Sequence, residues 1–338
     1  MRVEDFLREP SKSVTSIGQA LTNACDMNCP HCYSRSYVKN KVSIEECKLI
    51  LKAFPNVKEI NFGTGETYLN PDFLDVFRFY QEKGICLALT TNGNTLNKMT
   101  DNEITTYLSD IDISLDFPRA ELHDQWRGVQ GAFKNAISGI ERAKKLNVNV
   151  SIALALTNKN YLYLPEFVDI LDEYDIFLRI NIYKPVHTSS LALSYEEFWK
   201  AMELIAENFG IMGSSEPILS LVLDDPIQGS SCGHSLRIHT DLSISGCVYL
   251  SNERIETNEF IKLSREIPDF CKKCPAVDRC RGGCLSRRIL QVGAQNPDFY
   301  CPLARGQPVP KLKIRRSPQK HLVHLNYLCT ILLSRRFL

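Results

Sequence analysis

Three cysteines stand within eight residues near the start of the chain, in the stretch NACDMNCPHCY: Cys25, Cys29 and Cys32. In a protein kept reduced, thiols this close together indicate metal or redox chemistry rather than disulfides. A zinc site would need a fourth ligand, either His31 or a distant residue. An iron–sulfur cluster held by three cysteines would instead leave one iron open to a substrate or cofactor.

A second group of seven cysteines lies between residues 230 and 304, four of them in the stretch CKKCPAVDRCRGGC. This region has few long apolar runs and many turn residues, so we expect bound metal to hold it together. A zinc ribbon is one possibility for any pair of cysteines separated by two residues. Seven cysteines with these gaps are a more specific signal.

Polar and glycine residues follow several apolar runs along the first half of the chain. The stretch GTGE covers Gly63–Glu66, TTNG contains Asn92, and DISLD contains Ser114 and Asp116; Arg127 lies in the later stretch HDQWRG. Glycines let the backbone approach a ligand, and a carboxylate pairs well with an ammonium group. Taken alone, each stretch also suits an ordinary turn, and His123 in the last one suits a residue that orders a loop.

Together, the first cysteine group and these stretches resemble the radical S-adenosylmethionine (SAM) enzymes. The resemblance implies that Cys25, Cys29 and Cys32 hold a [4Fe–4S] cluster whose open iron is chelated by the amino and carboxylate groups of SAM. It also implies that GTGE meets the SAM amino group, and that the SLD and RG stretches meet its ribose and carboxylate. The residues expected to contact SAM are Tyr33, Gly63, Gly65, Glu66, Asn92, Ser114, Asp116 and Arg127.

The second cysteine group resembles the SPASM extension, which follows a radical SAM core and holds two auxiliary [4Fe–4S] clusters. The resemblance implies that one cluster is closed by Cys271, Cys274, Cys280 and Cys301. It assigns the other to Cys232, Cys247 and Cys284, with a fourth ligand unidentified or absent; His234 and His239 are candidates.

Two departures from the family pattern stand out. Thr64 replaces the usual second glycine of the glycine-rich motif, and Gly246 directly precedes Cys247 instead of standing several residues before it. Cys247 is therefore the least certain ligand. Sulfatase-maturing relatives carry an acidic residue after this cysteine, where the present chain has Val248.

The elements that must position these residues follow from the apolar runs. Six runs alternate with amphipathic segments between residues 14 and 185, which suits strands buried on both faces of a parallel sheet. Ser43 with Glu46, and Thr100 with Glu103, are typical of capping boxes that begin helices. We therefore predict an α/β fold, a partial (β/α)6 TIM-type barrel followed by a cysteine-rich SPASM domain, with ligands at the carboxyl ends of the strands.

Four segments are expected: a core over residues 1–190, a helical connection over 191–229, the cluster-binding extension over 230–304 and a basic tail over 305–338. Eight of the 40 Lys and Arg residues and none of the 39 Asp and Glu residues lie in the tail, so the rest is mildly acidic. We expect the tail to be dispensable for the chemistry and to dock an acidic partner, if it has a role. Of the three other cysteines, Cys47 and Cys86 are expected in the core and Cys329 in the tail.

The sequence thus predicts an enzyme whose reduced cluster cleaves SAM to a 5′-deoxyadenosyl radical that removes hydrogen from a substrate. The resemblance favours a ribosomally made precursor peptide or protein as substrate, with flavodoxin or ferredoxin as electron donor. The alternatives are a radical SAM enzyme for a small molecule, an electron carrier, and a zinc-stabilised binding protein whose basic tail contacts nucleic acid. No nucleic-acid motif is present, and neither a signal peptide nor a membrane-spanning run is evident, so we expect a cytoplasmic protein.

Overall fold

The computed structural model describes residues 1–34, 41–222, 236–250, 255–316 and 329–337. Its contacts divide the chain into two compact units. Unit 1 comprises Met1–Ala153, Cys232–Asn258 and His321–Asn326, and unit 2 comprises Leu154–Ser231, Glu259–Lys320 and Tyr327–Leu338.

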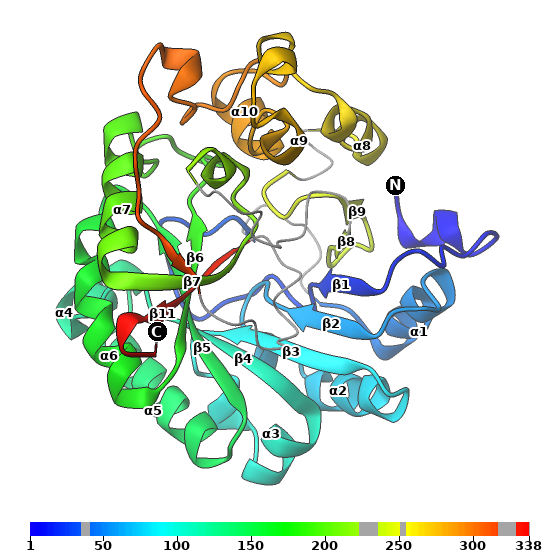
Figure 1. The fold of residues 1–338 in the computed structure, drawn as a ribbon. Coiled ribbons are helices and arrows are strands. Elements are labelled where there is room, and N and C mark those ends of the chain that lie inside the picture. Colours follow the sequence, from blue (N-terminus) through cyan, green and yellow to red (C-terminus); the bar gives the residue numbers. More distant parts are fainter. Residues whose placement is uncertain (35–40, 223–235, 251–254, 317–328, 338) are drawn as a thin grey trace. The chain divides into compact units, whose positions relative to one another are not determined.

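The sheet of unit 1 is built from successive parallel strands. Its strand order is β9-β8-β1-β2-β3-β4-β5, and the neighbours from β8 to β5 are parallel. Strands β8 and β9 form an antiparallel pair at the edge of this sheet. In Figure 1, β1 to β4 lie side by side in chain order. The bounds are β1 Ser16–Gln19, β2 Glu59–Phe62, β3 Cys86–Thr91, β4 Leu108–Ser114, β5 Asn149–Leu156, β8 Leu236–Ile238 and β9 Ile244–Ser245.

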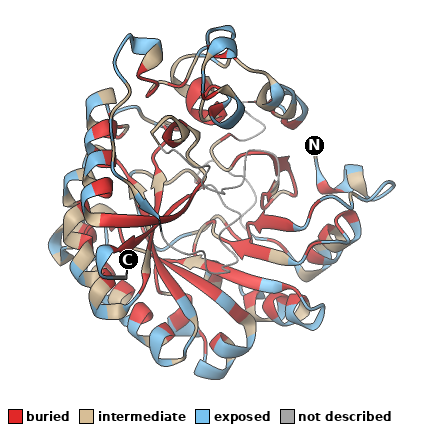
Figure 2. Cartoon of the chain, viewed as in Figure 1, coloured by how far each residue is buried: buried red, intermediate tan, exposed pale blue. Residues whose placement is uncertain are grey.

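Helices follow the strands of unit 1 and begin where the sequence indicated. Ser43 and Glu46 form a capping box at the start of α1, as do Thr100 and Glu103 at the start of α3. Figure 2 shows the strands mostly buried and the helices exposed on one side, as expected for helices that cover a sheet. The bounds are α1 Ile44–Ala53, α2 Phe73–Glu82, α3 Asp101–Tyr107, α4 Ala120–Arg127 and α5 Ala132–Lys145.

In unit 2 the strand order is β5-β6-β11-β7-β10, with the last residues of β5 at one edge. The bounds are β6 Phe177–Ile182, β7 Phe209–Ser214, β10 Arg315–Arg316, β11 Thr330–Ser334, α6 Phe167–Tyr174, α7 Tyr195–Asn208, α8 Thr257–Arg265, α9 Val277–Cys280 and α10 Leu285–Gln291. Helix α8 begins in unit 1 and continues in unit 2. The cysteine-rich part consists of short helices and turns, as its composition predicted.

Part of the C-terminal segment belongs to the folded core of unit 2, which weakens the expectation that the segment is dispensable for the chemistry. Strand β11 lies between β6 and β7, antiparallel to both, and all five of its residues are buried. Strand β11 is therefore part of the sheet of unit 2. The exposed bases of β10 and the residues before it remain as the basic part of this segment.

The predicted class of fold is confirmed. Strands β1 to β6 follow one another in the order of the six predicted apolar runs, and each is followed by at least one helix. This is the arrangement of successive βα units in a partial barrel. Among the described residues, none of the helices has the length and apolar character needed to cross a membrane.

Candidate functional site

The first cysteine group lies in the loop after β1, within unit 1. Cys25 is exposed, Cys29 is buried and Cys32 is half-buried, and the amide N–H of Cys32 donates to the carbonyl of Cys29 at 3.3 Å. Met27, Cys29 and Ala132 form a small buried cluster against which Cys32 packs. The packing fixes this loop on the start of α5 and leaves Cys25 open to solvent.

A buried charged pair stands behind Cys29. Arg127, at the end of α4, donates from Nη1 to the Cys29 sulfur at 3.4 Å and pairs through Nη2 with Asp116 at 2.6 Å. Burial raises the pKa of the Cys29 thiol, while the guanidinium of Arg127 acts in the opposite direction. The sequence-predicted residues Asp116 and Arg127 therefore lie against the cysteine loop.

Glu66 is locked inside unit 1 by four donors from a single loop. Its carboxylate accepts from the amides of Asn92 and Thr95, each at 2.9 Å, and from the hydroxyls of Thr91 and Thr95. The residue is 1% exposed, and burial raises its pKa against the effect of these donors. The carboxylate that was expected to meet SAM thus holds together the loop that follows β3.

The glycines of GTGE lie directly against the cysteine loop. Gly65 has a φ of +65°, and a Cβ there would approach the carbonyl oxygens of Thr22 and Ala24 too closely for any side chain. The Tyr33 hydroxyl donates to the carbonyl of Gly63 at 3.1 Å. The residues 63–66 and 22–33 therefore form one continuous surface of backbone and cysteine.

Asp26, which the sequence analysis did not select, ties this surface to the loop after β3. It accepts from the side-chain amides of Asn92 and Asn94, each at 2.7 Å, and from the Tyr68 hydroxyl at 3.0 Å. Asp26 is nevertheless exposed. Asp26 is a carboxylate that directly follows the first cysteine of the motif, and this position could have marked it as a candidate site residue.

The remaining predicted residues lie around the end of β4. Ser114 is half-buried at the last position of this strand, and Asp116 follows it in the interior. The His123 ring accepts at Nδ1 from the Asp116 amide at 3.1 Å, which confirms the predicted loop-ordering role. His31 stacks on Trp126 with ring centroids 5.4 Å apart, and its Nε2 is 3.8 Å from Asp116 Oδ2.

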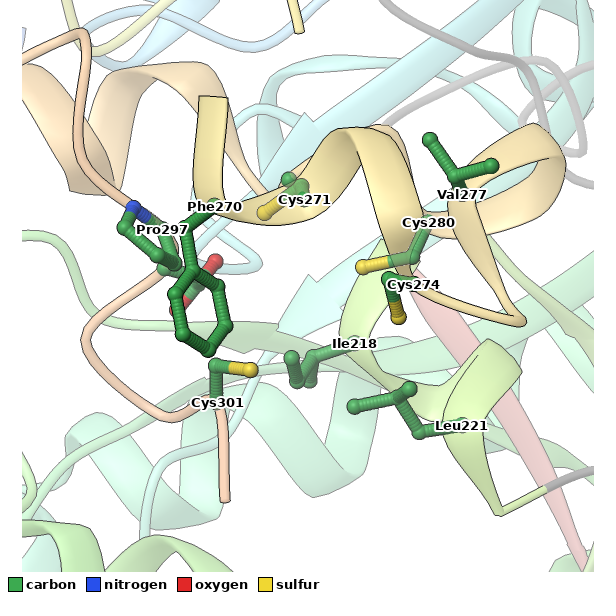
Figure 3. A pocket seen from close by; sticks show the side chains of 11 residues that line it. Ile218, Leu221, Phe270, Cys271, Cys274, Val277, Cys280, Pro297 and Cys301 are labelled. Carbon is green, nitrogen blue, oxygen red and sulfur yellow. The ribbon is translucent and has the colours of Figure 1, made fainter. Parts of the chain in front are cut away.

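Four cysteines of the second group surround one pocket in unit 2. Cys271, Cys274, Cys280 and Cys301 line it, together with apolar residues that include Ile218 and Phe270. Figure 3 shows these four side chains arranged around the same space. They are the four cysteines that the resemblance assigned to a single cluster, and that a cluster occupies the pocket remains a prediction.

The other proposed auxiliary ligands are only partly described. Cys232 and His234 lie outside the described residues, Cys247 belongs to unit 1, and Cys284 belongs to unit 2. His239 is buried in the β8–β9 hairpin, where its Nε2 is 2.8 Å from the Ser245 hydroxyl. This contact gives the ring a structural role.

Three cysteines lie outside both groups. Cys47 is buried, as predicted, and receives a hydrogen bond from Gln19 at 3.3 Å. Cys86 was predicted in the core but is exposed, because it is the first residue of β3. Cys329 is buried beside β11. In the described part of the chain, no three His, Cys, Asp or Glu side chains are arranged to hold a metal ion.

Comparison with known families and proteins agrees with this site. Residues 20–175 match the Radical SAM superfamily. This match covers a little under half of the chain and indicates a radical SAM domain over these residues; members of that superfamily hold a [4Fe–4S] cluster and SAM.

Several curated proteins are similar to the chain. The AdoMet-dependent heme synthase of Oleidesulfovibrio alaskensis is 26% identical over 59% of this chain and 54% of its own length. The Fe-coproporphyrin III synthase of Methanosarcina barkeri is 28% identical over 55% of this chain and 49% of its own. The chain thus spans about half the length of these relatives. The mycofactocin maturase MftC of Mycobacterium ulcerans is 24% identical over 90% of this chain and 92% of its own.

Two solved structures share the fold. The structure titled native anSMEcpe with bound AdoMet and Kp18Cys peptide has a TM-score of 0.66 at 18% identity, covering 86% of this chain and 95% of that one. Streptococcus suis SuiB bound to S-adenosylmethionine has a TM-score of 0.65 at 17% identity, covering 86% and 77%.

Proposed function

We propose that this chain cleaves SAM reductively and uses the resulting radical to modify a ribosomally made peptide. The observation that carries the proposal is the meeting, within unit 1, of the cysteine loop, the GTGE backbone, the loop after β3 and the Asp116–Arg127 pair. These residues come from four segments between residues 22 and 127. If each motif were only an ordinary turn, the four segments would have no reason to lie together.

The residues present fit a [4Fe–4S] cluster. Three cysteines from one short loop supply three thiol donors, and the Arg127 guanidinium offsets negative charge at the Cys29 sulfur. Coordination to iron deprotonates such thiols outright. When bound, the reduced cluster supplies one electron that breaks the sulfonium–C5′ bond of SAM and so generates the 5′-deoxyadenosyl radical.

The chain's own residues have positioning roles in this proposal. The backbone at Gly65 lies against the carbonyl oxygens of Thr22 and Ala24, next to Cys25, where the SAM amino group needs acceptors. Asn92 and Asp26 form the polar wall next to it, and Glu66 holds that wall in place from the interior. Ser114, Asp116 and Arg127 remain candidates for the ribose and carboxylate, and Tyr33 supports the Gly63 backbone.

We also propose that unit 2 holds an auxiliary [4Fe–4S] cluster on Cys271, Cys274, Cys280 and Cys301. Four thiols around one partly apolar pocket match the ligand count of such a cluster. The second auxiliary cluster, on Cys232, Cys247 and Cys284, rests on the resemblance to the SPASM extension.

A peptide substrate is favoured by how far each likeness extends along the chain. The maturase MftC is similar over 90% of this chain, whereas the heme and coproporphyrin synthases are similar over less than 60%. The titles of the two peptide complexes, anSMEcpe with Kp18Cys and SuiB with precursor peptide SuiA, belong to proteins of the same fold. The synthases make a tetrapyrrole the second candidate substrate.

The substrate class can be tested with deuterium. The reconstituted, dithionite-reduced enzyme is incubated with SAM and either a deuterated short peptide encoded beside its gene or a deuterated coproporphyrin. We expect deuterium in 5′-deoxyadenosine only with the peptide. Transfer from the porphyrin instead would establish the second candidate, and transfer from neither would overturn the proposed peptide.

The electron for each turnover must come from a protein in the cell, and a low-potential flavodoxin or ferredoxin fits that need. A reducing compartment such as the cytoplasm would keep the cysteine ligands as thiols and is the location that this proposal implies. Replacement of dithionite by a reduced flavodoxin in the same assay tests this partner.

A further inference from the structure

A buried carboxylate, Asp298, stands between two parts of the second cysteine group in unit 2. It is 2% exposed and lines the pocket formed by Cys271, Cys274, Cys280 and Cys301. A fully buried Arg287 binds it with two hydrogen bonds, Nε to Oδ1 at 2.7 Å and Nη2 to Oδ2 at 2.5 Å. This bidentate geometry fixes the plane of the carboxylate.

Asp298 also makes hydrogen bonds to both cysteine segments. Its Oδ2 accepts from the Cys284 amide at 2.8 Å, and its Oδ1 accepts from the Tyr300 amide at 3.0 Å. Its own carbonyl accepts from the Cys301 amide at 2.9 Å, and its amide donates to the carbonyl of Gly282 at 3.0 Å. One residue therefore joins the turn between Cys280 and Cys284 to the segment that carries Cys301.

The two glycines in CRGGC make this approach possible. Gly283 has a φ of +89°, and a Cβ built on it would overlap the Asp298 side chain. Gly293 has a similar φ of +92°, but a Cβ there would only come within 3.3 Å of the Asn296 side-chain nitrogen. A side chain at position 283 would therefore collide with Asp298, in addition to the strain that the positive φ imposes.

Arg287 has a second carboxylate partner away from the cysteines. Glu216 accepts from Nη1 at 2.9 Å and from Nη2 at 2.6 Å, and the guanidinium lies 4.7 Å from the centre of the Tyr300 ring. Two carboxylates face one guanidinium, so these three side chains together carry one net negative charge beside the pocket. Of the two carboxylates, Asp298 is the one that binds cysteine segments.

We propose that Asp298 is a positioning residue that holds Cys284 and Cys301 in one rigid arrangement and keeps the reduction potential of the neighbouring cluster low. The proposal rests on the proposed auxiliary clusters. Hydrogen bonds and charges around the ligands of a metal site set their geometry and the potential of the metal. Arg287 supports Asp298 from the opposite side, and Glu216 balances Arg287 without touching a cysteine segment.

The test uses the full chain with Cys25, Cys29 and Cys32 changed to Ala, so that all remaining iron belongs to the second cysteine group. Asp298→Asn is compared with Glu216→Gln, because each removes one carboxylate from Arg287. Gly283→Ala is compared with Gly293→Ala, because both place alanine at a positive φ. Iron release to a chelator and the midpoint of a redox titration followed by electron paramagnetic resonance are measured for each.

We expect Asp298→Asn and Gly283→Ala to release iron about tenfold faster than their controls. Asp298→Asn should also raise the reduction potential, since a negative charge beside the cluster is lost. Gly283→Ala keeps the negative charge of Asp298, so its reduction potential should change less. Thermal unfolding of the iron-free chains shows whether any variant releases iron only because it is poorly folded.

If Asp298→Asn and Glu216→Gln release iron equally and share one potential, Asp298 has no special role and the inference is overturned, while the auxiliary cluster stands. If the parent chain with the three alanines holds no iron, the proposed auxiliary clusters fail, and this inference fails with them.

Discussion

The Glu66 carboxylate is buried in unit 1, where it accepts four hydrogen bonds from the end of β3 and the loop that follows. Glu66→Gln should lower the free energy of unfolding by about 2–3 kcal/mol, because an amide cannot accept from all four donors. SAM affinity should fall as well, since Asn92 loses its support. Chemical denaturation of the iron-free chain and calorimetry of SAM binding measure the two effects.

Glu45→Gln is the control, since Glu45 is a largely exposed residue whose side chain pairs with exposed Lys48. Its stability should match that of the unchanged chain. A Glu66→Gln variant as stable as this control but with much weaker SAM binding would show that Glu66 touches SAM directly. The glycine-rich motif alone predicted that contact.

His123 should make the stability of unit 1 depend on pH. Burial lowers its pKa to about 4 from an ordinary value of 6.5, and the Asp116 amide donates to its ring. The unfolded chain therefore binds a proton between pH 6.5 and 4 that the folded chain refuses, so stability falls as the pH is lowered through this range. The loss is on the order of 3 kcal/mol.

His123→Asn keeps an acceptor for the Asp116 amide and cannot take up a proton. We expect its unfolding free energy to change less between pH 7 and 4 than that of the unchanged chain. Denaturation curves across this range compare the two, and parallel pH profiles would assign the acid sensitivity to other groups.

Residue types and spacing predicted which side chains meet, but not every contact they make. The cysteine loop and Asp116 were selected because their motifs follow strands, and Arg127 was selected because its stretch resembles the family; the ion pair between Asp116 and Arg127 was not predicted. Asp26 and the true partners of Glu66 were not predicted either, since their hydrogen bonds come from residues 25 to 68 positions away along the chain. No local pattern records such pairings.

Among the helices and strands, β11 is a strand that the sequence analysis did not predict. The strands β1 to β6 were predicted because each is a continuous apolar run with a helix after it. The run in β11 follows a basic stretch, and its neighbours β6 and β7 lie more than 110 residues earlier in the chain. The sequence therefore indicated an extension, whereas the side chains of β11 are buried in unit 2.

Leu332, in the middle of β11, is fully buried. Leu332→Ala should cost about 3 kcal/mol of unfolding free energy through lost burial and the cavity left behind. Arg315→Ala, at an exposed position of β10, should leave stability unchanged. A chain ending at Arg305 should not fold unit 2, because it lacks the whole strand.

Denaturation of the two point variants and solubility of the shortened chain measure these effects. A shortened chain that stays soluble and keeps its iron would restore the view that the C-terminal segment is dispensable.

At the scale of the whole molecule, the two units carry separate cysteine chemistry. Unit 1 carries most of the residues that match the Radical SAM superfamily, and unit 2 carries the four-cysteine pocket. The sequence predicted both groups because cysteine spacing is local. It could not predict the division into units, because that division depends on how distant segments pack. The four predicted segments therefore stay a prediction.

The proposed function requires that Cys25, Cys29 and Cys32 hold a cluster that cleaves SAM. The most direct measurement is iron content and 5′-deoxyadenosine formation after anaerobic reconstitution and reduction with dithionite, for the unchanged chain and for the chain with these three cysteines changed to Ala. We predict about twelve iron atoms per unchanged chain and slow SAM cleavage without substrate. The changed chain should lose about a third of the iron and all SAM cleavage. Stoichiometric zinc without iron, or SAM cleavage that survives the three substitutions, would contradict the account.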